Sequence, residues 1–174
     1  MKRVIFAVAA LALVTTGAHA AKSAAELEKE KAMANPYPND YGPDKLDVSD
    51  YKNKEGYKLL TTKCAKCHSA ARPLNSRFAE PAAGQKIAPY KDKNVLQVED
   101  KVWNRYVKRM MAKPGCDIPP AEGKKIWEFL VEDSMKRKSG EAQAAYIAHR
   151  QKLIEDFKKA HPKRYEELKK ANDL

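Results

Sequence analysis

The sequence predicts an all-α fold. Several segments carry apolar residues at the spacing of a helix face, and no stretch alternates apolar and polar residues for long enough to build a sheet. Prolines and glycines stand between these segments, at the places where helices end. We therefore expect one modest helical domain with a small core and additional segments at its ends.

The first residues have the features of a secretory signal peptide. Lys2 and Arg3 give a basic start, residues 4–14 form an uninterrupted apolar stretch, and residues 18–20 read Ala-His-Ala. The apolar stretch is too short to span a bilayer. We expect residues 1–20 to be removed and the mature protein to be periplasmic without a stable membrane anchor; a retained anchor is the alternative.

The charge balance favours acidic partners. Without Lys2 and Arg3, the 34 basic side chains become 32 against 23 acidic ones, a formal charge of +9. Such an excess attracts an acidic protein or an anionic surface. The basic residues are scattered among Glu and Asp rather than gathered with aromatic residues, so we expect no nucleic-acid partner.

Residues 21–46 are expected to be an N-terminal tether and a Pro-rich linker. Residues 23–34 are rich in helix formers but have almost no apolar face. Residues 35–44 contain three prolines and a glycine, which disfavour regular structure. We expect the main domain over residues 47–138 and a helical extension over residues 139–174.

Helices are expected over residues 50–66, 101–113, 121–138 and 141–160, with a short last helix ending near residue 171. Asp47 to Ser49 offer N-caps for the first helix, and Pro114 and Gly115 end the second. The buried face of the third should consist of Ile126, Trp127, Phe129 and Leu130. Residues 69–99 form a long irregular stretch of the kind that wraps a ligand.

Residues 64–68 carry the most specific chemical signal. Cys64-Ala65-Lys66-Cys67-His68 is a C-x-x-C-H sequence, the attachment signature of a c-type haem. On one helical turn, the two thiols reach the two vinyl groups and the adjacent imidazole is carried under the iron. A bare C-x-x-C can also be a redox disulfide or half of a zinc site, but no second Cys pair and no preceding strand accompany this one. We expect one covalent haem c on Cys64 and Cys67, with His68 as its proximal ligand.

The third cysteine, Cys116, is left over. Three cysteines are an odd number for an exported protein, in which thiols normally pair. We expect Cys116 to be a free thiol without a ligand cluster near it; an intermolecular disulfide and a thiolate iron ligand are the alternatives.

The sixth iron position distinguishes an electron carrier from a binder of small molecules. A second strong ligand closes the site, whereas an open position permits gas binding or peroxide chemistry. A methionine on a helix stripe can also be ordinary core. The candidate ligands are Met33, Met110, Met111, Met135, His149, His161 and Cys116.

Three patterns resemble class I cytochromes c over about residues 47–135. The residues 56–60, Gly-Tyr-Lys-Leu-Leu, precede the C-x-x-C-H motif as in the first helix of that family, where a glycine lets the first and last helices cross closely. Ile126-x-x-Phe129-Leu130 resembles the last helix, whose aromatic residue lies at that crossing. Trp103-x-x-x-Val107-x-x-Met110 is similar to a segment of small bacterial monohaem cytochromes in which the methionine is the distal ligand.

This resemblance implies a class I-like cytochrome c fold around one covalent haem, with an irregular haem-wrapping loop and an extra C-terminal helical extension. It implies Met110 as the distal ligand, with Met111 as the alternative, and Pro73 as the source of the carbonyl that accepts the second N–H of His68.

The haem propionates have three candidate partners in the sequence. Arg72 and Arg77 can pair with them bidentately or be ordinary surface residues. Trp103 can donate its indole N–H to a propionate or pack in the core beside the haem.

We expect a carrier that passes single electrons between exported or membrane-bound redox partners, and no enzyme, because no acid–base or nucleophilic constellation is visible elsewhere. Partners with acidic docking surfaces should meet Lys58, Lys63 and Lys66. The alternatives are a haem subunit fixed in a larger respiratory or dehydrogenase complex, and an open-site haem protein that binds a gas or peroxide.

Overall fold

The computed structural model describes residues 21–78, 95–96, 100–171 and 174. The expected signal peptide, residues 1–20, lies outside the described residues. So does most of the expected haem-wrapping loop, residues 79–94 and 97–99.

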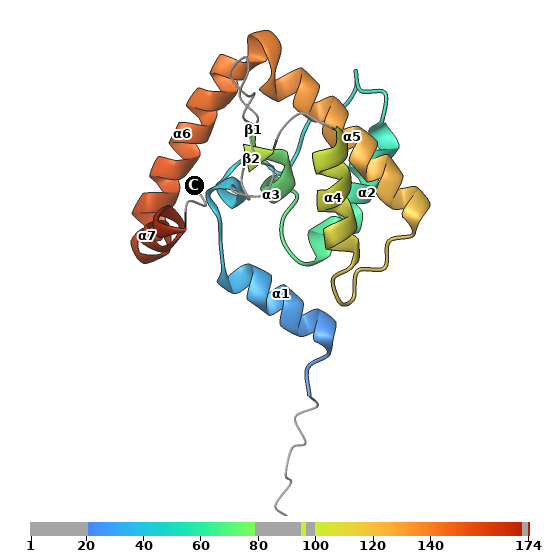
Figure 1. Ribbon diagram of the computed structural model, residues 1–174, viewed down its shortest axis with the longest axis horizontal. Helices are drawn as coiled ribbons and strands as arrows, with labels where there is room; N and C mark the ends of the chain where they lie inside the picture. The colour runs from blue at the N-terminus through green and yellow to red at the C-terminus, as the bar shows by residue number, and fades with distance from the viewer. Residues whose placement is uncertain (1–20, 79–94, 97–99, 172–173) are drawn as a thin grey trace, which may run out of the picture.

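The described chain is helical, which confirms the predicted all-α class (Figure 1). Its α-helices are α1 (Ala24–Ala34), α2 (Lys54–Thr62), α3 (Ala71–Leu74), α4 (Asp100–Met111), α5 (Pro120–Lys138), α6 (Gln143–Ala160) and α7 (Pro162–Lys170). Single 3₁₀ turns occupy Pro38–Tyr41, Cys64–Lys66 and Gly140–Ala142. Two-residue strands β1 (Arg77–Phe78) and β2 (Val95–Leu96) pair in parallel, with Arg77 opposite Val95.

The bounds of α4, α5 and α6 agree with the sequence to within two residues, whereas α3 lies in a stretch expected to be irregular and α2 is shorter than expected. This helix begins at Lys54, after the expected caps at residues 47–49, and its N-cap Asn53 makes no capping bond with its side chain. The carboxylate of Glu132 on α5 accepts the backbone N–H groups of Lys52 and Asn53 at 2.8 and 2.9 Å. A contact from a distant helix therefore fixes where α2 begins, which local sequence could not indicate.

The core lies where α2 and α4 pack on α5 (Figure 1). Trp103 of α4 and Phe129 of α5 are fully buried, and Leu60, Ile126 and Leu130 are 1% exposed. The expected face of α5 is confirmed, with Trp127 only partly buried at its edge. Each fully buried large apolar side chain contributes about 1.5–3 kcal/mol to burial, so these few residues supply most of the hydrophobic stabilisation of the domain.

Helices α2 and α5 cross in close contact at Gly56. A Cβ atom at this position would lie 2.1 Å from the carbonyl oxygen of Lys125 and 2.6 Å from the Cβ of Phe129. Both neighbours belong to the body of α5, so they cannot move aside cheaply. Only glycine permits this separation, and the crossing fixes the direction in which α2 leads to residues 64–68.

The N-terminal linker is part of the folded structure, which differs from the expectation that folding begins after it. Pro38 and Asn39 are buried, and the ring of Tyr41 meets that of Phe157 on α6 edge-on, with centroids 5.8 Å apart. Arg150 of α6 donates to the amide oxygen of Asn39. The prolines do prevent a long helix here, but the single 3₁₀ turn that remains is held by the C-terminal extension.

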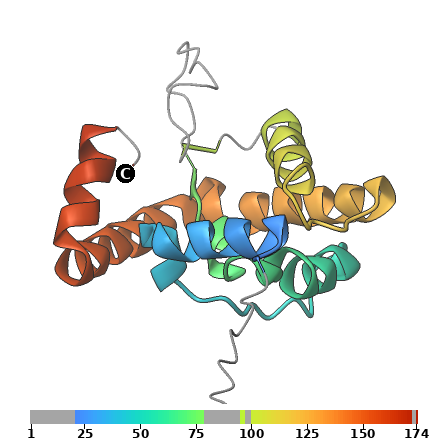
Figure 2. The same ribbon diagram turned by 90° about the horizontal axis from the view of Figure 1, so that it is seen from below.

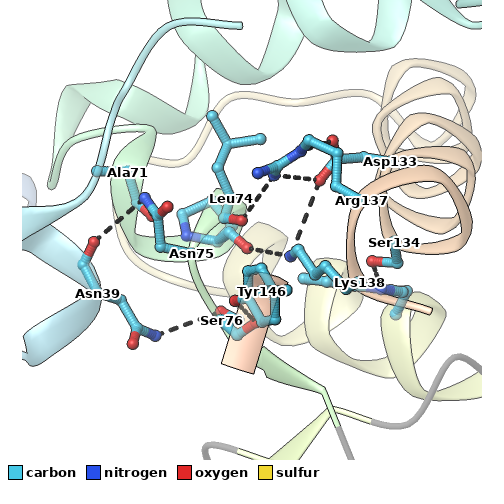
Figure 3. A network of polar contacts seen from close by, with 12 residues as sticks. Asn39, Ala71, Leu74, Asn75, Ser76, Asp133, Ser134, Arg137, Lys138 and Tyr146 are labelled. Carbon is cyan, nitrogen blue, oxygen red and sulfur yellow. Dashed lines mark hydrogen bonds and ion pairs between the residues drawn. The ribbon is translucent and has the colours of Figure 1, made fainter. Parts of the chain in front are cut away.

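A buried ionic network joins α5 to α3 and α6 (Figure 3). Asp133 is fully buried and accepts two hydrogen bonds from Arg137, at 2.6 and 2.7 Å, and one from the hydroxyl of Tyr51 at 3.0 Å. Arg137 also donates to the carbonyl oxygen of Leu74 at 2.8 Å. The Nζ of the fully buried Lys138 lies 3.8 Å from Asp133.

Two aromatic rings enclose the Lys138 ammonium. Its Nζ lies 5.6 Å from the ring centroid of Trp103 and 5.4 Å from that of Tyr146, whose hydroxyl donates to the carbonyl of Ser76. Burial lowers the pKa of Lys138 to about 7, and the nearby Asp133 carboxylate only partly opposes this shift.

Replacing Gly56 with alanine should destabilise the protein. Because the added methyl group would overlap the α5 backbone, we expect Gly56→Ala to lower the free energy of unfolding by about 1–3 kcal/mol. Glu55→Ala, at the exposed neighbouring position, should change it by less than about 0.5 kcal/mol. Chemical denaturation of both variants measures the difference, and equal stability of the two would contradict the close crossing.

Replacing Lys138 should remove one component of the pH dependence of stability. Between pH 7 and 10.5 the unfolded chain binds a proton that folded Lys138 has released, so the free energy of unfolding should rise with pH. Relative to Lys138→Met, the wild type should gain up to about 1.4 kcal/mol per pH unit in this window.

Denaturant melts from pH 6 to pH 10 test this prediction. Lys124→Met, on the exposed side of the same helix, is the control, and its difference from the wild type should stay constant. A constant difference for Lys138→Met as well would show that the buried ammonium keeps its proton throughout.

Candidate functional site

A cavity of about 560 Å³ opens beside the core and has the size of a cofactor site. Its inner wall is apolar and is formed by Leu60, Val107, Ile118, Ile126 and Leu130. Its chemically distinctive residues are Cys64, Cys67, His68, Met110, Met111 and Cys116. Segments far apart in the sequence thus bring sulfur and imidazole groups to one hollow.

The two cysteines of the motif lie on a tight turn. Helix α2 ends at Thr62, and Cys64–Lys66 form one 3₁₀ turn that continues into Cys67 and His68. Both thiols and the imidazole line the cavity. The motif therefore sits at the end of the helix that the Gly56 crossing positions, on a turn that presents all three groups to one space.

The imidazole of His68 has a different carbonyl partner from the one expected. Its Nδ1 lies 3.0 Å from the carbonyl oxygen of Ser69, the next residue. The carbonyl of Pro73 instead accepts the N–H of Ser76 at 3.3 Å and lies 3.5 Å from the Nζ of Lys138. The prediction of Pro73 as this partner is wrong, because α3 directs its carbonyl toward α5; Pro73 itself still lines the cavity.

Burial sets the protonation of the site. It lowers the pKa of His68, and the positive charge of Arg72 lowers it further, so the ring favours its neutral form. A neutral imidazole is the form that ligates a metal. Burial also raises the pKa of Cys64 to about 12, with smaller contributions from Cys116 and Cys67. A thiol held in its protonated form is not the low-pKa nucleophile of a disulfide oxidoreductase.

Cys116 lines this cavity, so the fold brings one of the alternative iron ligands of the sequence to the motif. It is half-buried against the core, and burial raises its pKa, as does the neighbouring Cys67. All three cysteines are free thiols. The expectation that no ligand group lies near Cys116 is wrong, because the turn after α4 folds back over the motif. A separation of 49 residues in sequence hides this contact.

The two adjacent methionines lie in different surroundings. A Cβ atom at Gly123 of α5 would lie 2.3 Å from the Sδ of Met111, so this thioether occupies the space that the glycine leaves. Met111 packs against the core cluster, whereas Met110 is half-buried at the cavity wall. Both residues line the cavity, but Met111 has a packing role that Met110 does not share.

Arg72 and Trp103 are engaged within the protein. Arg72 lines the cavity but donates to both carboxylate oxygens of Asp40, at 2.8 and 2.7 Å. Trp103 is buried in the core, and its Nε1 donates to the hydroxyl of Ser134 at 3.1 Å. The core interpretation of Trp103 therefore holds, and the cavity lining does not include this residue. The Arg77 side chain lies outside the described residues.

The other candidate iron ligands lie away from the cavity. Met33 and Met135 are 63% and 54% exposed. The Nε2 of His149 lies 3.3 Å from the amide oxygen of Asn75, and the ring of His161 stacks obliquely on Phe157. Of the candidates in the sequence, Met110, Met111 and Cys116 are thus the ones that the fold brings to the motif.

Helix α1 covers one side of the cavity, where Figure 2 shows it in front of α3. It has no buried residue; Ala25 lies against Gly115, and polar contacts hold the rest of the helix. Glu28 pairs with Lys113 at 3.0 Å, and the guanidinium of Arg72 donates to the carbonyls of Ala32 and Asn35. A helix expected to be a tether is therefore fixed at the site by charges, which an apolar pattern cannot reveal.

No family model matches the chain, and neither a curated protein nor a solved structure matches it. In the described ranges 21–78 and 100–171, no helix has the length and apolar character needed to cross a bilayer. Within that same part of the chain, no group of three or more His, Cys, Asp and Glu side chains is placed to hold a metal ion.

Proposed function

We propose that this chain is a periplasmic monohaem c-type cytochrome that transfers single electrons between redox proteins. One observation carries the proposal: Cys64, Cys67, His68 and Met110 line a single cavity of about 560 Å³. The C-x-x-C-H motif alone specifies an attachment sequence. The motif lies at a cavity large enough for a cofactor, and a thioether from another helix lies at the same cavity. This position supports haem attachment at the motif.

The donor set fits a haem c. The thiols of Cys64 and Cys67 would hold it covalently, His68 would ligate the iron from one helix segment, and Met110 would ligate it from α4. The apolar inner wall excludes water, and the neutral imidazole favoured by burial suits ligation. When bound, the haem supplies an iron that takes up and releases one electron.

The chain's own residues would tune that electron exchange. A thioether ligand and a dry, apolar wall both favour the reduced state, which carries less positive charge. The carbonyl of Ser69, 3.0 Å from Nδ1 of His68, orients the ring and fixes its tautomer. We assign no bond-breaking reaction to the site, and the protein would act by ligation, burial and docking.

The fold we propose is that of a class I cytochrome c with additional helices at both ends. The close crossing of α2 and α5 at Gly56 and Phe129 supports this assignment, because the family resemblance places a glycine and an aromatic residue at that crossing. Here α1 and the pair α6–α7 would be additions that pack around the haem domain.

Met110 is the distal ligand we favour. Both methionines line the cavity, but Met111 already fills the space beside Gly123, whereas Met110 has no such packing role.

Export and docking follow from the sequence. The signal peptide expected over residues 1–20 would deliver the chain to the compartment in which haem c is attached. Lys58 and Lys66 are exposed near the motif, and Lys66 lines the cavity. Lys63 pairs with Glu122 and would contribute less to docking. An acidic redox partner would be steered to this region.

Covalent haem is the first prediction. The purified protein should keep haem-dependent peroxidase staining on a denaturing gel, and Cys64→Ala combined with Cys67→Ala should abolish it. Cys116→Ala is the matched control and should keep the stain, because this thiol is not in the motif. Haem that extracts from the wild type into acidified organic solvent would refute covalent attachment.

Met110→Ala should remove the sixth ligand of the haem iron. The oxidised variant should lose the weak far-red methionine charge-transfer band, and its reduction potential should fall. Met111→Ala should keep the band but lose stability by about 1–3 kcal/mol, because it removes a partly buried side chain that packs beside Gly123. The reverse pattern would make Met111 the ligand.

Carbon monoxide binding to the reduced wild type would instead favour the open-site alternative.

Salt should separate a mobile carrier from a fixed subunit. Second-order oxidation by an acidic redox partner should slow steeply as ionic strength rises, because the Debye length falls from about 30 Å at 0.01 M to about 3 Å at 1 M. Lys66→Gln should lower the low-salt rate more than Lys170→Gln on α7, which lies away from the cavity. A rate independent of salt, with the protein co-purifying in a large complex, would favour the fixed haem subunit.

A further inference from the structure

Arg164 of α7 reaches the cavity from the C-terminal extension. Its Nη1 donates to Glu167 at 2.9 Å, and its guanidinium carbon lies 5.4 Å from the ring centroid of Tyr37. Tyr37 also lines the cavity. The last helix of the chain, which a haem domain of this size does not need for its core, therefore contributes directly to the wall of the site.

The Nε of Arg164 is buried and has no hydrogen-bond partner in the described part of the chain. A buried charged donor without an acceptor destabilises the structure, because it has lost its hydrogen bonds to water. A bound group that brings an acceptor oxygen into the cavity would remove this destabilisation.

A second guanidinium lies at the same ring. The guanidinium carbon of Arg72 is 5.2 Å from the centroid of Tyr37. Two like charges around one ring repel each other unless anions compensate them. Arg72 has its own carboxylate in Asp40, with both groups less than a fifth exposed, whereas the partner of Arg164, Glu167, is 64% exposed and weakly held.

Away from its apolar inner wall, the cavity has a basic lining. Lys31, Lys63, Lys66, Arg72, Arg109, Lys113 and Arg164 line it, against a single acidic residue, Glu28, among the described lining residues. A planar guanidinium with a buried Nε matches the two oxygens of a carboxylate better than an ammonium does. The ligand end that suits the Arg164 side of the cavity is therefore a carboxylate.

We propose that Arg164 binds a propionate of the haem, so that the C-terminal extension is a functional part of the haem site. This inference rests on the proposed function, because the carboxylate belongs to the haem. In this proposal Arg164 takes the role of propionate partner that the sequence suggested for Arg72. The guanidinium of Arg72 already donates to both carboxylate oxygens of Asp40. The Arg164 guanidinium would orient the haem edge and balance the charge of its carboxylate.

The test compares full-length Arg164→Gln with Lys170→Gln, which removes one positive charge from an exposed position on the same helix. Haem staining on a denaturing gel is read first in both variants. Absence of staining in the wild type would refute the proposed function. If the wild type and both variants stain, the remaining readouts test the role of Arg164 alone.

The first readout is the reduction potential as a function of pH. Ionisation of a propionate favours the oxidised iron, so the potential falls as pH rises through the pKa of that propionate. A paired arginine holds this pKa low. Arg164→Gln should therefore move the step to higher pH and lower the potential at neutral pH, and Lys170→Gln should reproduce the wild-type curve.

The second readout is the propionate bending band in the resonance Raman spectrum, which a purely structural role of Arg164 would not move. It should shift in Arg164→Gln and also in Arg164→Lys, because an ammonium lacks the Nε donor. The lysine variant keeps the charge and serves if the glutamine variant does not fold. An unchanged band and an unchanged potential curve, or equal changes in Lys170→Gln, would overturn the proposal.

Discussion

The contact of α2 with α5 at Gly56 is the constraint on which the site depends. The two helix backbones approach so closely that a Cβ atom would lie 2.1 Å from a carbonyl oxygen of α5. This approach fixes the axis of α2 and hence the direction in which Cys64 and Cys67 leave it. Helix α4 packs on the same helix α5 and brings Met110 to the cavity. One shared helix thus positions groups that are more than 40 residues apart.

The buried ionic network connects α5 to α3 and α6. Arg137 and Lys138, in the last turn of α5, donate to the carbonyl groups of Leu74 and Pro73 in α3, and Lys138 also faces a ring of α6. Asp133 accepts from Arg137. Removing Asp133 would leave Arg137 and Lys138 without the carboxylate that lies between them, which is strongly destabilising in a buried site. The network therefore ties the segment that carries Pro73 and Arg72 to the extension, and makes the three parts fold together.

Charge organises the outer side of the cavity. Helix α1 is fixed by Glu28 and by its carbonyls to Arg72, without any buried apolar side chain. Helix α7 contributes Arg164. Polar ties of this kind are weaker and more sensitive to salt than an apolar core. They would suit a cover around the haem that we propose.

The sequence by itself determined the helical class, the bounds of α4 and α5, the buried face of Ile126, Phe129 and Leu130, and the motif Cys64-x-x-Cys67-His68. These features are local, because periodicity, capping residues and a short motif lie within one or a few turns. The signal peptide and the haem itself remain predictions of the sequence.

Tertiary structure alone decided the rest. It placed Cys116 and Arg164 at the cavity, gave Met111 the space beside Gly123, and turned Pro73 and Arg72 to partners other than those expected. It also buried Asn39 beneath Arg150 of the extension. Each of these contacts joins residues whose meeting depends on how whole helices pack, and neither spacing nor composition encodes the partner that a side chain meets across such a distance.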